Sequence, residues 1–251
     1  MSASEKNDRR SAENTAKKEK RMFGANLDFG AKEAYKTLRT NLEFALADVE
    51  GCRVIGVSSA TRGEGKSLTS LNICYTLAES GKRVLLIGGD LRLPTLSRKL
   101  GIPNGKGLSD VIADASIQAI PIRRYTVKTK EKTETSFGVL LSGSVPPNPS
   151  ELLGSERMRL LMEALRESYD YIILDLPPVL AVTDTLVASK IVDGFVIVVR
   201  NGVTDKNAYA ETIRQLRFAD ARILGCVFNC ADRERMTKRG YYHYDYYYQS
   251  K

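Results

Sequence analysis

The sequence contains no tryptophan, a single histidine (His243) and only four cysteines in 251 residues. One histidine excludes a histidine-based metal cluster and a Ser-His-Asp catalytic triad. The spacing of the cysteines fits neither a disulfide framework nor a paired CxxC zinc site. We therefore expect reduced and mostly buried thiols at Cys52, Cys74, Cys226 and Cys230.

Long hydrophobic runs are also absent. No stretch approaches the roughly 18 apolar residues that cross a bilayer, and no hydrophobic core of a signal peptide is present. We therefore expect a chain that neither spans nor crosses a membrane unaided.

The net charge of +8 is concentrated in three segments. Residues 1–21 and 121–136 each carry +3, residues 232–251 carry +2, and the rest of the chain is balanced. Such segments are usually solvated, and weak attraction to anionic lipid headgroups is the alternative. The distribution does not indicate a shaped nucleic-acid groove, so no nucleic-acid partner is expected. Residues 121–136 have the composition of a polar, basic loop.

Short apolar runs alternate with helical patterns along the chain. The runs are apolar throughout instead of alternating, which is typical of a parallel sheet covered on both faces. The sequence thus predicts an α/β fold with a doubly wound, mostly parallel sheet. Strands are expected at residues 53–59, 83–90, 137–143, 169–178, 194–202 and 222–229. Helices are expected at 32–46 and 66–80, from the SELL run to about 166, from about 183, and around 207–219.

The first strand leads through "ATRGEGKS", Ala60 to Ser67, into a helix. Apart from Ala60 in place of the first glycine, this is a P-loop. Its glycines let backbone N–H groups close around phosphates, and the helix N-terminus adds partial positive charge. Lys66 is expected to reach the β- and γ-phosphates and Ser67 to ligate Mg²⁺. The predicted ATP-binding residues are Gly63, Glu64, Gly65, Lys66, Ser67 and Leu68.

Two carboxylates are placed to complete this site. Asp175 ends the strand in "YIILDLPP", and Asp90 follows the strand in "LLIGGDLR". A P-loop needs such a carboxylate to hold the metal, and parallel strands deliver their carboxyl ends to one edge. We therefore predict Lys66, Asp90 and Asp175 as catalytic, Ser67, Asp90 and Asp175 as the metal ligands, and ATP and Mg²⁺ as cofactors.

The chain ends in "GYYHYDYYYQSK", which holds six of its twelve tyrosines. A buried strand would not carry so many phenols beside a histidine and an aspartate. The six are Tyr241, Tyr242, Tyr244, Tyr246, Tyr247 and Tyr248.

The stretches "ATRGEGKS", "LLIGGDLRLPT", "SGSVPPNPSELL" and "YDYIILDLPPV", followed by this tail, closely resemble the bacterial tyrosine kinases, or BY-kinases. The resemblance runs from about residue 30 to the C-terminus and is closest to the separate cytoplasmic kinases of capsule and exopolysaccharide operons. It implies ATP-dependent phosphorylation of the tail tyrosines, in trans, by a neighbouring copy. The division expected is a disordered basic arm at 1–30, a P-loop kinase domain at 31–231 and a phosphoacceptor tail at 232–251.

The resemblance also implies partners. These are a transmembrane polysaccharide co-polymerase adaptor, which brings the cytoplasmic kinase to the membrane, and a cognate tyrosine phosphatase. The family motif E-x-x-R-x-x-R, which lines an octameric ring, corresponds to Glu33, Lys36 and Arg39. Lys36 keeps the charge of the usual arginine but lacks its planar fork.

A second departure concerns the usual D-x-D sequence after the second strand, which here is Gly88, Gly89 and Asp90. On an extended backbone Gly88 and Asp90 would point to the same face. The missing carboxylate is the family's candidate for orienting Mg²⁺ and accepting the tyrosine proton. We expect nucleotide binding to survive and phosphorylation to be slow.

Two alternatives belong to other functional classes. A ParA/MinD-type ATPase switch would carry a signature lysine early in the loop, where this chain has Thr61. A nucleotide-binding scaffold without catalysis is compatible with Gly88.

Overall fold

The computed structural model describes residues 23–114, 119–129 and 133–231. Its centre is a seven-stranded sheet with the order β3-β4-β2-β5-β1-β6-β7. Every neighbouring pair is parallel except β3 with β4. The doubly wound, mostly parallel α/β fold is therefore confirmed. The strands are β1 (Arg53–Ser59), β2 (Val84–Gly88), β3 (Arg123–Lys128), β4 (Glu134–Leu140), β5 (Tyr171–Asp175), β6 (Gly194–Arg200) and β7 (Ile223–Asn229).

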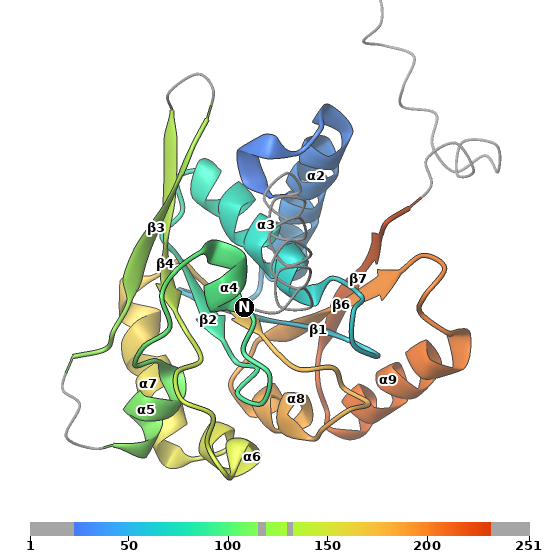
Figure 1. The fold of residues 1–251 in the computed structure, drawn as a ribbon. Helices are drawn as coiled ribbons and strands as arrows, with labels where there is room; N and C mark the ends of the chain where they lie inside the picture. Colours follow the sequence, from blue (N-terminus) through green and yellow to red (C-terminus); the bar gives the residue numbers. More distant parts are fainter. Residues whose placement is uncertain (1–22, 115–118, 130–132, 232–251) are drawn as a thin grey trace, which may run out of the picture.

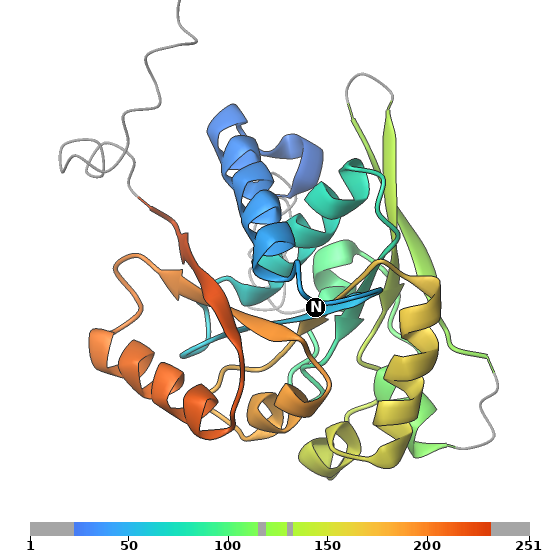
Figure 2. The ribbon, with the colours of Figure 1, turned by 180° about the vertical axis from the view of Figure 1, so that it is seen from behind.

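Helices cover both faces of this sheet (Figures 1 and 2). On one face α3 lies across the central strands and α2 packs on α3, while α5, α7 and α9 lie on the other face. The helical elements are η1 (Gly24–Asn26), α2 (Phe29–Ala45), α3 (Lys66–Glu79), α4 (Leu96–Leu100), α5 (Leu108–Ala113), α6 (Pro149–Leu153), α7 (Glu156–Ser168), α8 (Asp184–Val187), η2 (Ala188–Lys190) and α9 (Lys206–Phe218). Within the described residues, no helix combines the length and apolarity needed to cross a bilayer.

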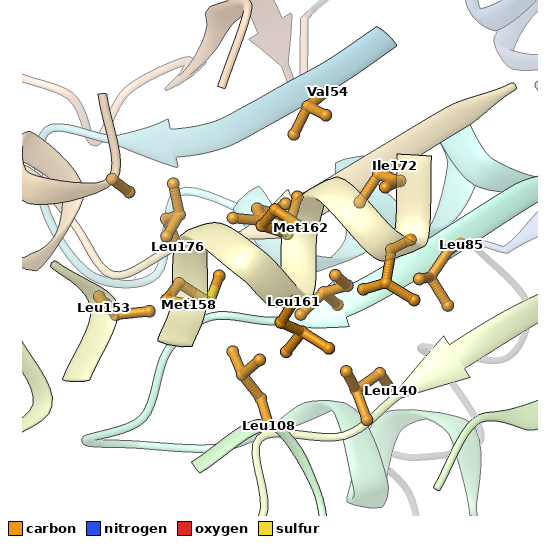
Figure 3. Close-up of a cluster of buried hydrophobic side chains, with 14 of the residues drawn as sticks. Val54, Leu85, Leu108, Leu140, Leu153, Met158, Leu161, Met162, Ile172 and Leu176 are labelled. Carbon is orange, nitrogen blue, oxygen red and sulfur yellow. The ribbon is translucent and has the colours of Figure 1, made fainter. Parts of the chain in front are cut away.

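Successive strand residues feed two separate hydrophobic cores. Val54 belongs to the core beneath α7, and Ile55 to the core beneath α3. Figure 3 shows the first core, where Met158 and Met162 of α7 lie over the sheet. Because side chains alternate across a strand, burial on both faces makes the strand sequences continuously apolar.

The segment 121–136 is not the loop that its charge suggested. It contains β3 and the start of β4, which pair antiparallel at one edge of the sheet. Tyr125 packs against Phe23 and Phe137, with ring centroids 6.1 and 5.7 Å apart. The lysines and arginines made the segment look uniformly polar, but alternate residues of β3 are partly buried. The basic residues therefore masked an alternation of partly buried and exposed positions that is typical of a strand.

The N-terminal boundary also differs from the expected one. Residues 23–30, assigned to the arm, belong to the folded body: Phe23 is buried against Tyr75, and α2 begins at Phe29. Asp28 caps α2 by accepting a 2.7 Å hydrogen bond from the Ala31 N–H. This capping places the helix start before the apolar periodicity begins.

The expectation of mostly buried cysteines is half right. All four are free, with Cys52 and Cys74 buried and Cys226 and Cys230 exposed. The two exposed thiols lie in or just after β7, an edge strand that is covered less completely than the central strands.

The helix expected to run from the SELL segment to about residue 166 is two helices. It breaks after α6, and Ser155 then caps α7 by accepting a hydrogen bond from the Met158 N–H. The short helices α4 and α5 had no periodic signal long enough to predict them.

Candidate active site

The P-loop lies where β1 passes into α3, at the carboxyl edge of the sheet. Gly63 and Gly65 have φ angles of +82° and +100°. Residues with a β-carbon rarely adopt this left-handed conformation, so the turn depends on these two glycines. Gly65 is the N-cap of α3, which places the N-terminus of a long helix directly behind the loop.

Lys66 lies between the two predicted carboxylates. Its Nζ is 3.1 Å from Asp90 Oδ2 and 3.7 Å from Asp175 Oδ1. Asp175 ends β5 and Asp90 follows β2, and these strands are neighbours in the sheet. The residues selected from three separate segments of the sequence are therefore brought into one cluster.

The electrostatics of this cluster are set by burial. The side chain of Asp175 is only 2% exposed, and this burial raises its pKa, against the opposing effects of the Lys66 ammonium and the Ser67 hydroxyl. For Lys66, burial lowers the pKa, but Asp175 and Asp90 raise it more, so the net shift is upward. Lys66 therefore stays protonated, and its positive charge stabilises the ionised form of the buried Asp175 carboxylate.

The same donors fit Mg²⁺. Asp90 and Asp175 offer carboxylate oxygens, and the Ser67 hydroxyl beside Asp175, which lowers the pKa of that carboxyl, offers a third oxygen. Mg²⁺ in phosphate sites takes one or two carboxylates and fills its other positions with phosphate oxygens and water. Among the described residues no group of three or more His, Cys, Asp or Glu gathers to form a complete metal cage. This set therefore suits a metal shared with a nucleotide.

The other predicted ATP-binding side chains point elsewhere. Glu64 is fully buried, and its carboxylate accepts hydrogen bonds from the Thr61 N–H (3.1 Å) and the Thr204 hydroxyl (2.6 Å). Leu68, in the first turn of α3, packs against the core shared by α2 and α3. For both residues, only the backbone is left for phosphate.

Gly88 and Asp90 lie on the same face, as expected, although the regular strand does not extend to Asp90: a β-carbon at position 88 would meet Leu96 of the core beneath α3, and Asp90 bonds Lys66 at the head of α3. β2 ends at Gly88, and the Gly89 N–H then bonds both Ile87 O (3.1 Å) and Asp175 O (2.9 Å). The intervening Gly89 faces Leu176 of the other core, so successive residues still alternate between the two faces through this bend.

The space beside Gly88 is occupied by another residue. Gly88 is opposite Asp175 in the β2–β5 register. A β-carbon at position 88 would come within 2.5 Å of Ser142 Oγ and 2.9 Å of Ser142 N. An aspartate at this position would therefore need Ser142 to move.

A clasp that closes over a buried carboxylate near the site was not predicted. The Arg92 guanidinium makes two 2.9 Å hydrogen bonds to Asp184, which is fully buried, and the Ser150 hydroxyl donates a third of 2.6 Å. This ties the loop after Asp90 to α6 and to the start of α8. The clasp explains part of the "PPNPSELL" motif, since Ser150 belongs to it. The sequence shows the three residues but not that they meet.

The three residues of the proposed ring contact lie on α2. Lys36 pairs with Glu33 at 2.8 Å, and both side chains are 47% exposed. Arg39 instead donates to Thr76 O of α3 at 2.9 Å, within its own chain. The phosphoacceptor candidates at 241–248 lie outside the described residues.

Comparisons with known proteins give the family. Residues 52–217 match the family model described as AAA domain. The chain is 36% identical over 210 residues to tyrosine-protein kinase YwqD of Bacillus subtilis (strain 168), covering 84% of this chain and 85% of that protein. The chain belongs to the bacterial tyrosine kinase family.

Other bacterial tyrosine kinases extend the match. The tyrosine-protein kinase etk of Escherichia coli (strain K12) is 32% identical over 211 residues, which are 84% of this chain but 28% of that longer protein. The solved kinase domain of this E. coli enzyme superposes with a TM-score of 0.70 and 33% identity, over 80% of this chain and 78% of that one. The chimerical protein CapA2B2 gives 0.68 and 31%, over 78% and 83%.

Proposed function

We propose that the chain is an ATP-dependent protein-tyrosine kinase that phosphorylates the tyrosine cluster at its own C-terminus, and thereby regulates capsule or exopolysaccharide synthesis and export. The observation that carries the proposal is the position of Lys66, at the head of α3 and between Asp90 and Asp175. Membership of the bacterial tyrosine kinase family supports it.

Each residue of the site has a distinct role in this proposal. The loop amides and Lys66 bind the β- and γ-phosphates of ATP, while Ser67, Asp90 and Asp175 hold Mg²⁺. The metal ion would neutralise charge on the phosphate oxygens. A phenol oxygen forms a bond to the γ-phosphorus, the bond from that phosphorus to the β–γ bridging oxygen breaks, and ADP leaves while the phenolic proton passes to solvent or a carboxylate.

The assembly proposed is a ring of copies, an octamer, in which each tail enters a neighbour's site. Glu33, Lys36 and Arg39 are the contacts proposed from the family motif. The long E. coli relative and the CapA2B2 chimera support a transmembrane co-polymerase as the adaptor that brings the kinase to the membrane. A tyrosine phosphatase would reverse the modification.

Phosphotyrosine detection tests the activity. The purified chain is incubated with Mg-ATP, with and without the cytoplasmic segment of a candidate adaptor, and compared with Lys66→Met. We expect tail phosphotyrosine in the parent and none in Lys66→Met. No phosphotyrosine under either condition, with nucleotide binding intact, would favour a scaffold instead.

Transfer in trans needs a separate design. Lys66→Met with an intact tail is mixed with an otherwise unaltered chain whose six tail tyrosines are phenylalanine. Neither protein can modify itself, so phosphotyrosine on the Lys66→Met chain requires transfer between copies. Phosphorylation of the parent alone, with a silent mixture, would instead mean transfer within one chain.

A further inference from the structure

Two side chains from the ends of β6 and β7 hold the back of the P-loop. Arg200 Nη1 donates to Gly63 O at 2.7 Å, and Asn229 Nδ2 donates to Glu64 O at 2.9 Å. Arg200 and Asn229 are partners in the β6–β7 register, so both reach the loop from the same place. We call this pair the brace.

The brace decides which way two peptide groups of the loop face. In a trans peptide the C=O and the following N–H point in opposite directions. When the Gly63 and Glu64 carbonyls face the brace, the N–H groups of Glu64 and Gly65 face away from it. Glycine permits several backbone conformations at both ends of this segment, so local preference alone does not select this one.

A third anchor fixes the residue between the two glycines. The buried Glu64 carboxylate accepts from the Thr204 hydroxyl, and Thr204 in turn accepts a 2.8 Å hydrogen bond from the Arg200 N–H. Contact is close on the Asn229 side as well, because a β-carbon at position 65 would lie 2.1 Å from Asn229 Nδ2. The loop is thus held from outside by the turn after β6 and by the end of β7.

We propose that Arg200 and Asn229 are positioning residues, which orient the loop's N–H groups toward phosphate and couple nucleotide binding to the root of the tyrosine-rich tail. The proposal rests on the nucleotide site proposed above. The Asn229 side chain also accepts, through Oδ1, a 2.9 Å hydrogen bond from the Cys230 N–H, two residues before the tail begins. Linkage is reciprocal, so phosphate that stabilises the loop also stabilises this junction.

Nucleotide affinity tests the first half of the proposal without requiring turnover. Mg²⁺ and a fluorescent ADP analogue are titrated against the parent, Asn229→Ala, Arg200→Ala and Arg200→Lys. Loss of one hydrogen bond to a carbonyl predicts about three- to tenfold weaker binding for Asn229→Ala, and loss of the charged donor about tenfold or more for Arg200→Ala. Arg200→Lys should recover part of the loss. Asn201→Ala, an exposed asparagine next to Arg200, is the matched control and should bind like the parent.

Inorganic pyrophosphate separates positioning from direct contact with the base. It is used to displace the fluorescent ADP and reports the phosphate loop alone. The brace predicts that Asn229→Ala weakens pyrophosphate and ADP by the same factor. A loss confined to ADP would overturn the proposal in favour of a base contact, and a lower melting temperature without a change in either affinity would reduce the brace to a structural role.

Cys230 reports the coupling to the tail. In a Cys226→Ser background, Mg-ADP is expected to slow modification of the exposed Cys230 by a thiol reagent several-fold in the parent and not in Asn229→Ala. Equal protection in both proteins would overturn the coupling. A parent that binds neither ADP nor pyrophosphate would overturn the proposed function and the brace together, whereas binding by the parent with unaffected variants would overturn the brace alone.

Discussion

At the scale of single residues, Gly88 lies where the resemblance to bacterial tyrosine kinases implies an aspartate. Introducing aspartate there places a β-carbon against Ser142, so we expect Gly88→Asp alone to lose about 1–3 kcal/mol of stability by overpacking. In Gly88→Asp/Ser142→Ala the hydroxyl is gone, and we expect part of the stability to return and tail phosphorylation to exceed the parent's rate at least tenfold. A positioned base is typically worth about 10²–10⁴-fold, and phosphoryl transfer depends mainly on positioning and metal charge, so the lower part of that range applies.

The measurements are urea unfolding and the initial rate of phosphotyrosine formation. Ser142→Ala alone is the control for the lost hydroxyl, and Lys66→Met should be inactive in every background. If the double variant folds well but is no faster than a parent that is already fast, the base lies elsewhere.

Asp175 predicts a pH dependence. Burial raises the pKa of this carboxyl above its ordinary value of 3.8, so it takes up a proton at a higher pH than an exposed aspartate. In the nucleotide-free protein the native state then binds more protons than the unfolded state, and the contribution of Asp175 to stability falls as pH rises through that window. Mg²⁺ requires the ionised form, so Mg-ADP affinity should fall as pH drops toward the raised pKa.

Calorimetric titration with Mg-ADP from neutral to acid pH checks this dependence. Asp175→Asn corrects for protonation of the nucleotide itself, since it lacks the carboxyl and should bind more weakly. An identical pH profile in both proteins would contradict the role of Asp175.

At the scale of elements, the Arg92–Asp184–Ser150 clasp joins three segments around the site. Removing the guanidinium leaves the buried Asp184 carboxylate short of two donors, so we expect Arg92→Ala to cost about 1–3 kcal/mol of stability. It should also slow phosphorylation, because the loop carrying Asp90 loses its tether. Arg92→Lys keeps the positive charge but lacks the planar guanidinium that makes two hydrogen bonds at once. Its stability and its phosphorylation rate should lie between those of the parent and of Arg92→Ala.

Urea unfolding and kcat for tail phosphorylation measure the two effects. Arg98→Ala, an exposed arginine of α4, is the matched control. A variant at Arg92 as stable and as fast as this control would show that the clasp holds nothing in place.

At the scale of the whole molecule, tail phosphorylation should oppose self-assembly. Each phosphate adds about −1.5 to −2 charges at pH 7, so six would add about −9 to −12 to a chain of net charge +8. A tail crowded with like charges is repelled from a neighbour's carboxylate-lined site. Light scattering after gel filtration should show a large assembly for the chain with six tail phenylalanines and a monomer for the fully phosphorylated chain. Equal masses would contradict the proposal.

The charged residues of the nucleotide site and the central strands could be predicted from the sequence, because short local sequence patterns indicate both. Gly63 and Gly65 are needed for the turn itself, and Lys66 follows at the head of a helix. Asp90 and Asp175 each end an apolar run, and parallel strands place such ends at one edge. The continuous apolar runs likewise predicted a sheet covered on both faces.

The remaining features depend on contacts between distant segments. Arg92 and Asp184 are 92 positions apart in the sequence, and Asn229 and Glu64 are 165 positions apart. Each pair meets only because the folded sheet brings these distant segments together. The hydrogen-bond partner of a polar residue depends on which residues lie near it in space, and composition and periodicity carry no information about such neighbours. For the same reason β3 was not predicted. Its charged residues are evident in the sequence, but the aromatic residues that partly bury one of its faces, Phe23 and Phe137, come from other parts of the chain. The sequence by itself determined the chemistry of the nucleotide site, and the tertiary structure decided what holds that site in position.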